Sequence, residues 1–182
     1  MRALSLDAST TCVGWALFND DDLLEYGRLV PTEGKLDWRE RCENLAPQLD
    51  ELIEKAKPEI IYQEAVPRGG SGGVTTGIQL GFVQGILYMV EKVMNNLPVK
   101  YIEVGTWRKD IGISTGDSHR DMKKIKSIEK ANELFGLGLE IEYTKSGNFK
   151  PTGADDISDA VLIYASTRDK YRKPLAFGKR RG

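Results

Sequence analysis

The sequence has very few of the residues that bind soft metals or form disulfides. Two cysteines, Cys12 and Cys42, and one histidine, His119, occur among 182 residues. A disulfide-stapled secreted domain needs several cysteine pairs, so that class is excluded and a reducing compartment is expected. A structural zinc site is also not expected, because it takes four cysteine or histidine ligands.

Export and membrane signals are also missing. The N-terminus has no basic segment followed by a long apolar stretch, so no signal peptide is predicted. No apolar run approaches the ~20 residues that span a bilayer. We therefore expect no membrane association.

The chain has almost no net charge, but its charges are unevenly distributed. It carries 26 basic and 27 acidic residues, with a formal net charge of -1. Bases gather at residues 120–130 and 168–181, and acids at 20–22 and 40–59. This distribution predicts a basic face on a neutral protein. The length predicts a single domain over residues 1–175, followed by a basic, flexible tail at 176–182.

The N-terminal third predicts an antiparallel meander followed by a helix. Residues 2–7, 13–18 and 23–30 are rich in apolar and β-branched residues and are separated by turn residues, so each is predicted to be a strand. Residues 36–56 have apolar side chains at helical spacing. Pro47 either kinks this helix or starts a second one.

The remaining chain alternates strands with helices. Strands are predicted at residues 59–64 and 99–104, with a helix from Thr75 or Thr76, as its cap, to about residue 95. Thr106 caps a short helical turn, a basic helix spans residues 119–135, and the last helix starts after Pro151. We expect residues 113–118 to form a loop and 141–150 to be irregular. The predicted class is α/β, with a mixed central sheet that has a three-strand antiparallel part at its N-terminal side and is flanked by helices.

Glycines mark two further features. The loop at residues 67–73 is glycine-rich but lacks the Gly-Lys-Ser/Thr ending of a nucleotide-binding P-loop. In the helix that follows, Gly77, Gly81 and Gly85 recur every four residues on one face. They would let this helix lie close either to the sheet or to a partner helix.

Acidic residues end two strands and start the last helix. Asp7 ends the first strand and Glu64 the fourth, whereas Asp156 and Asp159 lie three residues apart on one helical face. Taken singly, some have simpler explanations. Asp7 could cap the following turn, and Asp155 has capping-box spacing from Thr152.

Together these acids predict a metal site. Gathered carboxylates repel one another unless a cation neutralises them. Oxygen ligands without cysteine or histidine select Mg²⁺, with Mn²⁺ as an alternative. Two such ions about 3.5–4 Å apart form the clamp used for phosphodiester cleavage.

Four stretches in order resemble the RuvC-type Holliday junction resolvases of the ribonuclease H-like superfamily. They read LSLDAS at residues 4–9 with GWA at 14–16, IIYQE at 60–64, LGFVQG at 80–85 and DISDA at 156–160. The resemblance implies a crossover junction endodeoxyribonuclease that cleaves four-way and other branched DNA as a homodimer in the cytoplasm of a bacterial cell or phage-infected host. It places Asp7, Glu64, Asp156 and Asp159 as catalytic ligands of two metal ions.

The chain departs from the bacterial pattern in two places. The loop after the second acid usually carries an aromatic wedge, and here residues 67–70 read PRGG. The WRK sequence at 107–109 looks more like the resolvases of bacteriophages. A relaxed preference that includes forks and flaps is expected from these departures.

Basic residues near the predicted site are candidate phosphate contacts. They are Arg68, Lys109, Lys123, Lys124 and Lys126. For each one, a solvated surface position is the simpler explanation.

Two other functions remain open from the sequence. Residues 7–11, followed by Gly14, resemble the first phosphate loop of actin-like ATPases and sugar kinases, although that class needs two such domains. A catalytically inactive junction-binding scaffold of the same fold would lack one of the acids, and none is missing here.

Overall fold

The centre of the molecule is a five-stranded mixed sheet with the strand order β3-β2-β1-β4-β5. The computed structural model describes residues 1–32, 35–66, 73–113 and 120–172. β1 (Arg2–Ala8), β2 (Val13–Asn19) and β3 (Asp22–Leu29) form the predicted antiparallel meander. β4 (Ile60–Glu64) runs parallel to β1, and β5 (Val99–Ile102) runs parallel to β4. The predicted fold class is confirmed.

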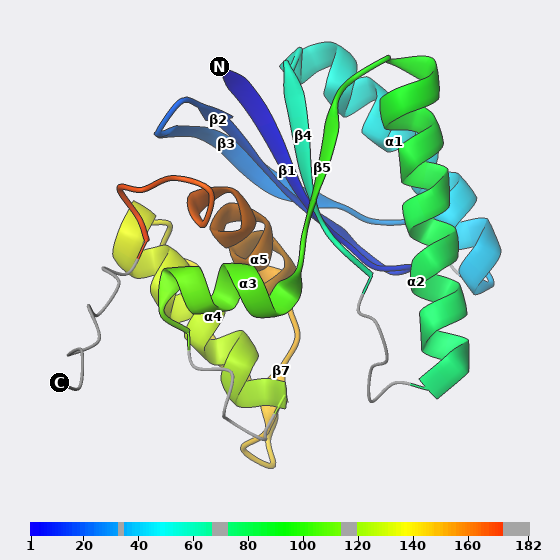
Figure 1. The fold of residues 1–182 in the computed structure, drawn as a ribbon. Coiled ribbons are helices and arrows are strands. Elements are labelled where there is room, and N and C mark those ends of the chain that lie inside the picture. Colours follow the sequence, from blue (N-terminus) through cyan, green and yellow to red (C-terminus); the bar gives the residue numbers. More distant parts are fainter. Residues whose placement is uncertain (33–34, 67–72, 114–119, 173–182) are drawn as a thin grey trace, which may run out of the picture.

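The strands β1, β2 and β4 are buried on both faces because helices cover each side of the sheet (Figure 1). Leu4 and Leu6 point to one face, against α1 (Trp38–Ala56), α2 (Gly73–Tyr88) and the π-helix η1 (Met89–Met94). The alternate residues face α3 (Val104–Ile111), α4 (Arg120–Phe135) and α5 (Ala154–Ala165). This two-residue alternation of side chains creates two separate cores.

α1 is a single helix that continues through Pro47. A capping box between Asp37 and Glu40 starts it, and Lys57 ends it in the left-handed conformation. Cys42, Leu45 and Leu49 are fully buried on either side of the proline. Packing of this face outweighs the one backbone hydrogen bond that proline removes, so the alternative of a second helix is wrong.

The helical segment after β4 differs from the sequence prediction in three ways. α2 begins at Gly73, so neither Thr75 nor Thr76 is its cap. A Cβ built on Gly77, Gly81 or Gly85 would meet open space, so packing of these glycines against the sheet is wrong. The run Gly73–Met94 has 22 residues and is apolar enough by length and composition to cross a membrane, contrary to our expectation, and most of it is exposed.

Three boundaries in the C-terminal half also differ. α3 begins at Val104 after Glu103 rather than at a cap on Thr106. The stretch expected to be irregular contains a hairpin of β6 (Glu142–Tyr143) and β7 (Phe149–Lys150). α5 is preceded by Gly153 in the left-handed conformation with no side-chain cap, so the predicted capping box between Thr152 and Asp155 is wrong.

Candidate active site

Asp7 and Glu64 lie side by side where two parallel strands end. Leu6 pairs with Gln63 in the register of β1 and β4, so the residue after each comes next along neighbouring strands. α5 packs across β1 and β2 and carries the other two predicted acids. Strands that run in parallel bring their carboxyl ends to one edge, which is why two distant strand-ending acids meet there.

The pKa of Asp7 shows that the four predicted acids form one electrostatic cluster. Burial raises the pKa of Asp7 well above its usual value, and the charges of Glu64, Asp159 and Asp156 raise it further. These carboxylates come from β1, β4 and α5. The structure therefore places the other three predicted acids within electrostatic reach of Asp7.

Glu64 is held by a buried tryptophan. Burial and then the charge of Asp159 raise the pKa of Glu64 to about 7, while the hydrogen bond from Trp107 lowers it. The indole Nε1 of Trp107 donates to Glu64 Oε2 over 2.8 Å, and Trp107 is fully buried. α3 thus orients the carboxylate of β4.

Asp159 of α5 is paired with an arginine of α3, the helix that also carries Trp107. Arg108 Nη2 donates to Asp159 Oδ2 over 3.1 Å, and both side chains are largely buried. Burial raises the pKa of Asp159, and the Arg108 charge opposes this rise. The sequence analysis did not predict that Trp107 and Arg108 belong to the site. The available signal was a tryptophan, which is usually buried, directly before the two basic residues Arg108 and Lys109.

Close packing of β2 against α5 sets the position of Asp156. Gly14 pairs with Asp7 across the β1–β2 ladder, and a Cβ on Gly14 would overlap the backbone carbonyl of Asp156. Burial raises the pKa of Asp156. Cys12 is buried beside it, and burial followed by the Asp156 charge raises the pKa of this thiol.

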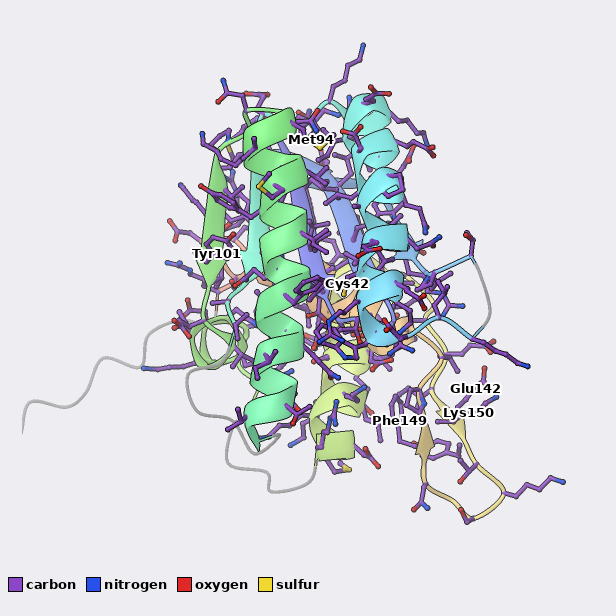
Figure 2. All side chains as sticks on the ribbon, turned by 90° about the vertical axis from the view of Figure 1, so that its right-hand side faces the viewer. Cys42, Met94, Tyr101, Glu142, Phe149 and Lys150 are labelled. Atoms are coloured by element: carbon purple, nitrogen blue, oxygen red, sulfur yellow. The ribbon has the colours of Figure 1, made fainter. Side chains whose placement is uncertain are left out.

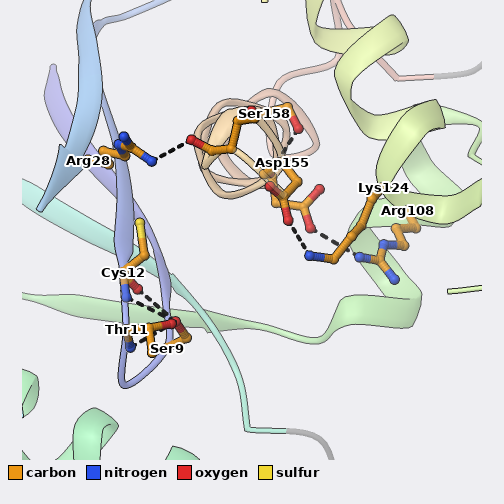
Figure 3. A network of polar contacts seen from close by, with 10 residues as sticks. Ser9, Thr11, Cys12, Arg28, Arg108, Lys124, Asp155 and Ser158 are labelled. Carbon is orange, nitrogen blue, oxygen red and sulfur yellow. Dashed lines mark hydrogen bonds and ion pairs between the residues drawn. The ribbon is translucent and has the colours of Figure 1, made fainter. Parts of the chain in front are cut away.

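Asp155 has a different role from its neighbour. Asp155 is 3% exposed and forms an ion pair with Lys124 from α4. In addition to burial, its charge raises the pKa of Asp156 and that of Asp159. Figure 3 shows Lys124 and Arg108 reaching α5 from two different helices. Asp155 therefore joins α4 to α5, and Asp156 faces the acid cluster.

The predicted phosphate contacts are found in different environments. Lys124 is engaged by Asp155 rather than free in solvent. Lys109 is exposed on α3, and Lys123 and Lys126 are half-buried on α4. Arg68, the rest of the loop at 67–72, His119 and the tail at 176–182 lie outside the described residues.

The donor set suits a hard divalent cation. Its potential ligands are carboxylate oxygens, and Asp159 Oδ1 is buried with no hydrogen-bond partner within residues that the structure describes. Across the same residues, no three His, Cys, Asp or Glu side chains stand in positions that could hold a metal ion without rearrangement. One carboxylate oxygen of Glu64 accepts a hydrogen bond from Trp107, and one of Asp159 accepts a hydrogen bond from Arg108.

Comparison with known proteins supports the resemblance seen in the motifs. No family model matches the chain. It is 26% identical to the crossover junction endodeoxyribonuclease RuvC of Fusobacterium nucleatum, covering 98% of this chain and 86% of that protein. Thermus thermophilus RuvC superimposes with a TM-score of 0.64 at 16% identity, covering 96% of this chain and 100% of that one. This chain has the RuvC fold.

Two further solved structures share this fold. T. thermophilus RuvC in complex with a Holliday junction substrate gives a TM-score of 0.64 at 16% identity, over 96% of this chain and 99% of that one. The yeast mitochondrial Holliday junction resolvase Ydc2 superimposes with a TM-score of 0.54 at 18% identity, covering 91% of this chain and 76% of that one. The predicted resemblance to the RuvC-type resolvases is confirmed along almost the whole chain.

Proposed function

We propose that this protein is a crossover junction endodeoxyribonuclease that hydrolyses phosphodiester bonds in four-way DNA junctions and other branched DNA. The observation that carries the proposal is the buried carboxylate cluster, in which Asp7 lies within the fields of Glu64, Asp156 and Asp159. The RuvC fold and the similarity to a RuvC nuclease support the same reaction. The cytoplasm is the proposed compartment.

The four acids would hold two divalent cations, Mg²⁺ or Mn²⁺. Bound there, the ions would supply an acidified water and positive charge at the scissile phosphate. The protein itself keeps the carboxylates in a low-dielectric setting, and burial is the main cause of the raised pKa values of Asp7, Asp156 and Asp159. The charges of Glu64, Asp159 and Asp156 raise the pKa of Asp7 further, and bound cations would relieve this repulsion.

Nearby protein groups orient the carboxylates and balance their charge. Trp107 fixes the rotamer of Glu64, so that one of its oxygens is oriented by the 2.8 Å hydrogen bond. Arg108 neutralises part of the charge on Asp159. Its guanidinium has further N–H donors that can bind a phosphate oxygen of the substrate. Lys109, Lys123 and Lys126 extend this positive charge and are the proposed contacts to the DNA backbone.

Cleavage of a labelled synthetic four-way junction with Mg²⁺ tests the proposal. Linear duplex, a three-way fork and an RNA–DNA hybrid serve as comparison substrates, and Asp7→Asn is the inactive control. Paired symmetrical nicks in the junction, absent with Asp7→Asn, are the expected result. Cleavage unchanged by Asp7→Asn would remove the carboxylate cluster from the reaction.

The same assay separates the alternatives. Cutting of the hybrid alone would indicate a ribonuclease, and firm junction binding without cutting in Mg²⁺ or Mn²⁺ would indicate a scaffold. An ATP-binding protein would show tight ATP binding by the isolated chain. The turn that resembles a phosphate loop is closed on itself, because the Ser9 hydroxyl accepts from the Cys12 N–H over 3.1 Å and donates to the Cys12 carbonyl over 3.0 Å (Figure 3).

The exposed side of α2 is the proposed homodimer interface. Its apolar side chains and glycines share one helical face, here called the α2 face: Val74, Ile78, Gly81, Phe82, Gly85 and Met89. Val74 is 81% exposed and Ile78 59%. Small residues at four-residue spacing let two helices approach closely. A two-fold dimer would also present two active sites, as paired cuts in a four-way junction require.

A further inference from the structure

A short β-hairpin projects from the molecule near the acid cluster. β6 and β7 pair through Glu142 with Lys150 and Tyr143 with Phe149, and residues 144–148 connect them. Figure 2 shows this hairpin extending beyond the body of the molecule, on the side where Phe149 and Lys150 are labelled. None of the functional assignments above uses this hairpin.

The hairpin has a well-defined tip. The Thr144 N–H donates to the Asn148 carbonyl over 2.8 Å, and the Gly147 N–H donates to the Thr144 carbonyl over 2.9 Å. Gly147 has a φ of 82°, which suits glycine. The Thr144 hydroxyl also accepts from the Asn148 N–H. These contacts hold the tip in one shape without help from a partner.

The base of the hairpin is attached to the helices that carry the site. Phe149 is 7% exposed and packs in a small core with Ile128 of α4 and Ala154 of α5. The Nζ atom of Lys124, which pairs with Asp155, lies 5.8 Å from the centre of the Phe149 ring. Only residues 151–153 separate β7 from α5. The hairpin is therefore held in a constant position relative to the acid cluster.

The exposed part of the hairpin offers one positive charge that is not neutralised. Residues 142–150 contain Lys145, Lys150 and one acid, Glu142. Lys150 is paired with Glu142, whereas Lys145 is exposed and has no ion-pair partner in the part of the chain that the structure describes. Tyr143, two residues before Lys145 in the chain, is 56% exposed. A cation next to an aromatic hydroxyl matches the sugar and phosphate groups of a nucleic acid backbone.

We propose that the β6–β7 hairpin binds the sugar-phosphate backbone of one duplex arm of the branched DNA, with Lys145 on a phosphate and Tyr143 beside it. This inference rests on the proposed function. It adds a contact outside the acid cluster that would set the direction in which the arm leaves the site. Because Phe149 packs against α4 and α5, the hairpin would hold the arm at a fixed angle to the acid cluster.

Binding of the full-length protein to a four-way junction tests the proposal. Lys145→Ala in an Asp7→Asn background is compared with Lys55→Ala in the same background, by fluorescence anisotropy over a range of salt concentrations. Lys55 is an exposed lysine of α1, near the end of the sheet opposite Glu64. Lys145→Ala should weaken binding about three- to tenfold at low salt and lower the salt slope by about one, whereas Lys55→Ala should not. Lys145→Arg should restore binding.

Arm length and a second variant sharpen the test. The difference between Lys145→Ala and Lys55→Ala should disappear on junctions whose arms are cut to a few base pairs. Persistence of the full difference there would overturn the assignment to a duplex arm. Tyr143→Ala should also weaken binding to long-armed junctions, and equal urea unfolding midpoints for all variants would show that each one folds.

The outcomes distinguish this proposal from the one on which it rests. If the unsubstituted protein binds and cuts junctions but Lys145→Ala behaves like Lys55→Ala at every salt concentration, the hairpin proposal is wrong and the nuclease proposal stands. If the unsubstituted protein neither binds nor cuts branched DNA, both proposals fail.

Discussion

Gly14 shows how one residue without a side chain can position an active site. It lies opposite Asp7 in the β1–β2 ladder, directly under the backbone of Asp156. The sequence marks Gly14 only as part of a strand that resembles a family motif. Its importance follows from the close approach of α5 to β2, which joins two segments far apart in the chain.

Gly14→Ala should therefore impair both stability and cleavage. The added methyl group must push α5 away from β2, which we expect to cost about 1–3 kcal/mol of unfolding free energy, as overpacking in a tight core does. Urea unfolding and junction cleavage measure the two effects. Gly105→Ala in α3 is the matched control, because a Cβ there meets nothing within 4 Å and replaces glycine in a helix. Equal unfolding free energies and equal cleavage rates for Gly14→Ala and Gly105→Ala would contradict the argument that Gly14 is needed for close packing of α5 on β2.

Asp7 should be unfavourable for the stability of the metal-free fold. The pKa of Asp7 is raised in the folded state, so the unfolded chain releases this proton at a lower pH than the folded chain does. The folded state therefore loses stability as the pH rises above the pKa of the unfolded chain. Asp7→Asn should raise the metal-free unfolding free energy at pH 8 and raise it by less at pH 4. It should also abolish cleavage.

Chemical unfolding with EDTA at the two pH values checks this prediction for Asp7. Asp169→Asn, whose side chain is almost fully exposed, is the control and should change little. Added Mg²⁺ should stabilise the unsubstituted protein and have little effect on Asp7→Asn, because a ligand stabilises only the state that binds it. A destabilised Asp7→Asn protein at pH 8 would refute the repulsion argument.

Among the elements, η1 contains the most unusual buried group. Glu91 is fully buried, and neither carboxylate oxygen has a hydrogen-bond partner within the described ranges. Burial raises its pKa to about 8. Burial and the charge of Glu91 also raise the pKa of Tyr101, on the neighbouring strand β5, to about 12. π-Helical turns often accompany such strained or functional positions.

Glu91→Gln should stabilise the protein in a pH-dependent way. The folded-state pKa lies above the unfolded value, so between about pH 4.5 and pH 8 the fold loses stability as pH rises. The neutral amide should therefore add about 1–3 kcal/mol at pH 8 and close to nothing at pH 5. Urea unfolding at both values, with the exposed Glu54→Gln as control, measures the difference. A benefit independent of pH would indicate improved packing rather than removal of a buried charge.

The elements also differ in how far local sequence predicts them. The strands β1 to β4 and helix α1 follow directly from apolar periodicity and turn residues, and they were predicted to within a few residues. The β6–β7 hairpin was missed because each strand has only two residues and depends on Phe149 packing against α4 and α5. The start of α2 was missed because the helix begins at Gly73, before the two threonines that the sequence offered as caps.

For the whole molecule, the α2 face predicts self-association. Ile78→Asp places a charge in the middle of this face and should convert a dimer into monomers at micromolar concentration while leaving the fold intact, because Ile78 is 59% exposed. Sedimentation equilibrium and circular dichroism measure the two properties. Lys55→Asp is the control, since it changes charge on an exposed residue of a different helix, α1.

Two outcomes would contradict the dimer. A monomer for the unsubstituted protein would leave the α2 face without its proposed partner. Flotation of that monomer with lipid vesicles, lost in Ile78→Asp, would assign the face to a membrane surface instead, which the length and apolar character of Gly73–Met94 also permit.

Local sequence was sufficient for the α/β class, the strand-ending positions of Asp7 and Glu64, and the shared helical face of Asp156 and Asp159, because these depend on periodicities of two and 3.6 residues. Three-dimensional packing established that Asp155 pairs with Lys124, that Trp107 and Arg108 hold the acids, and that the glycines of α2 face outward. Those contacts join residues that are distant in the chain. Periodicity says which face of an element is buried, but only the packed fold says what that face meets.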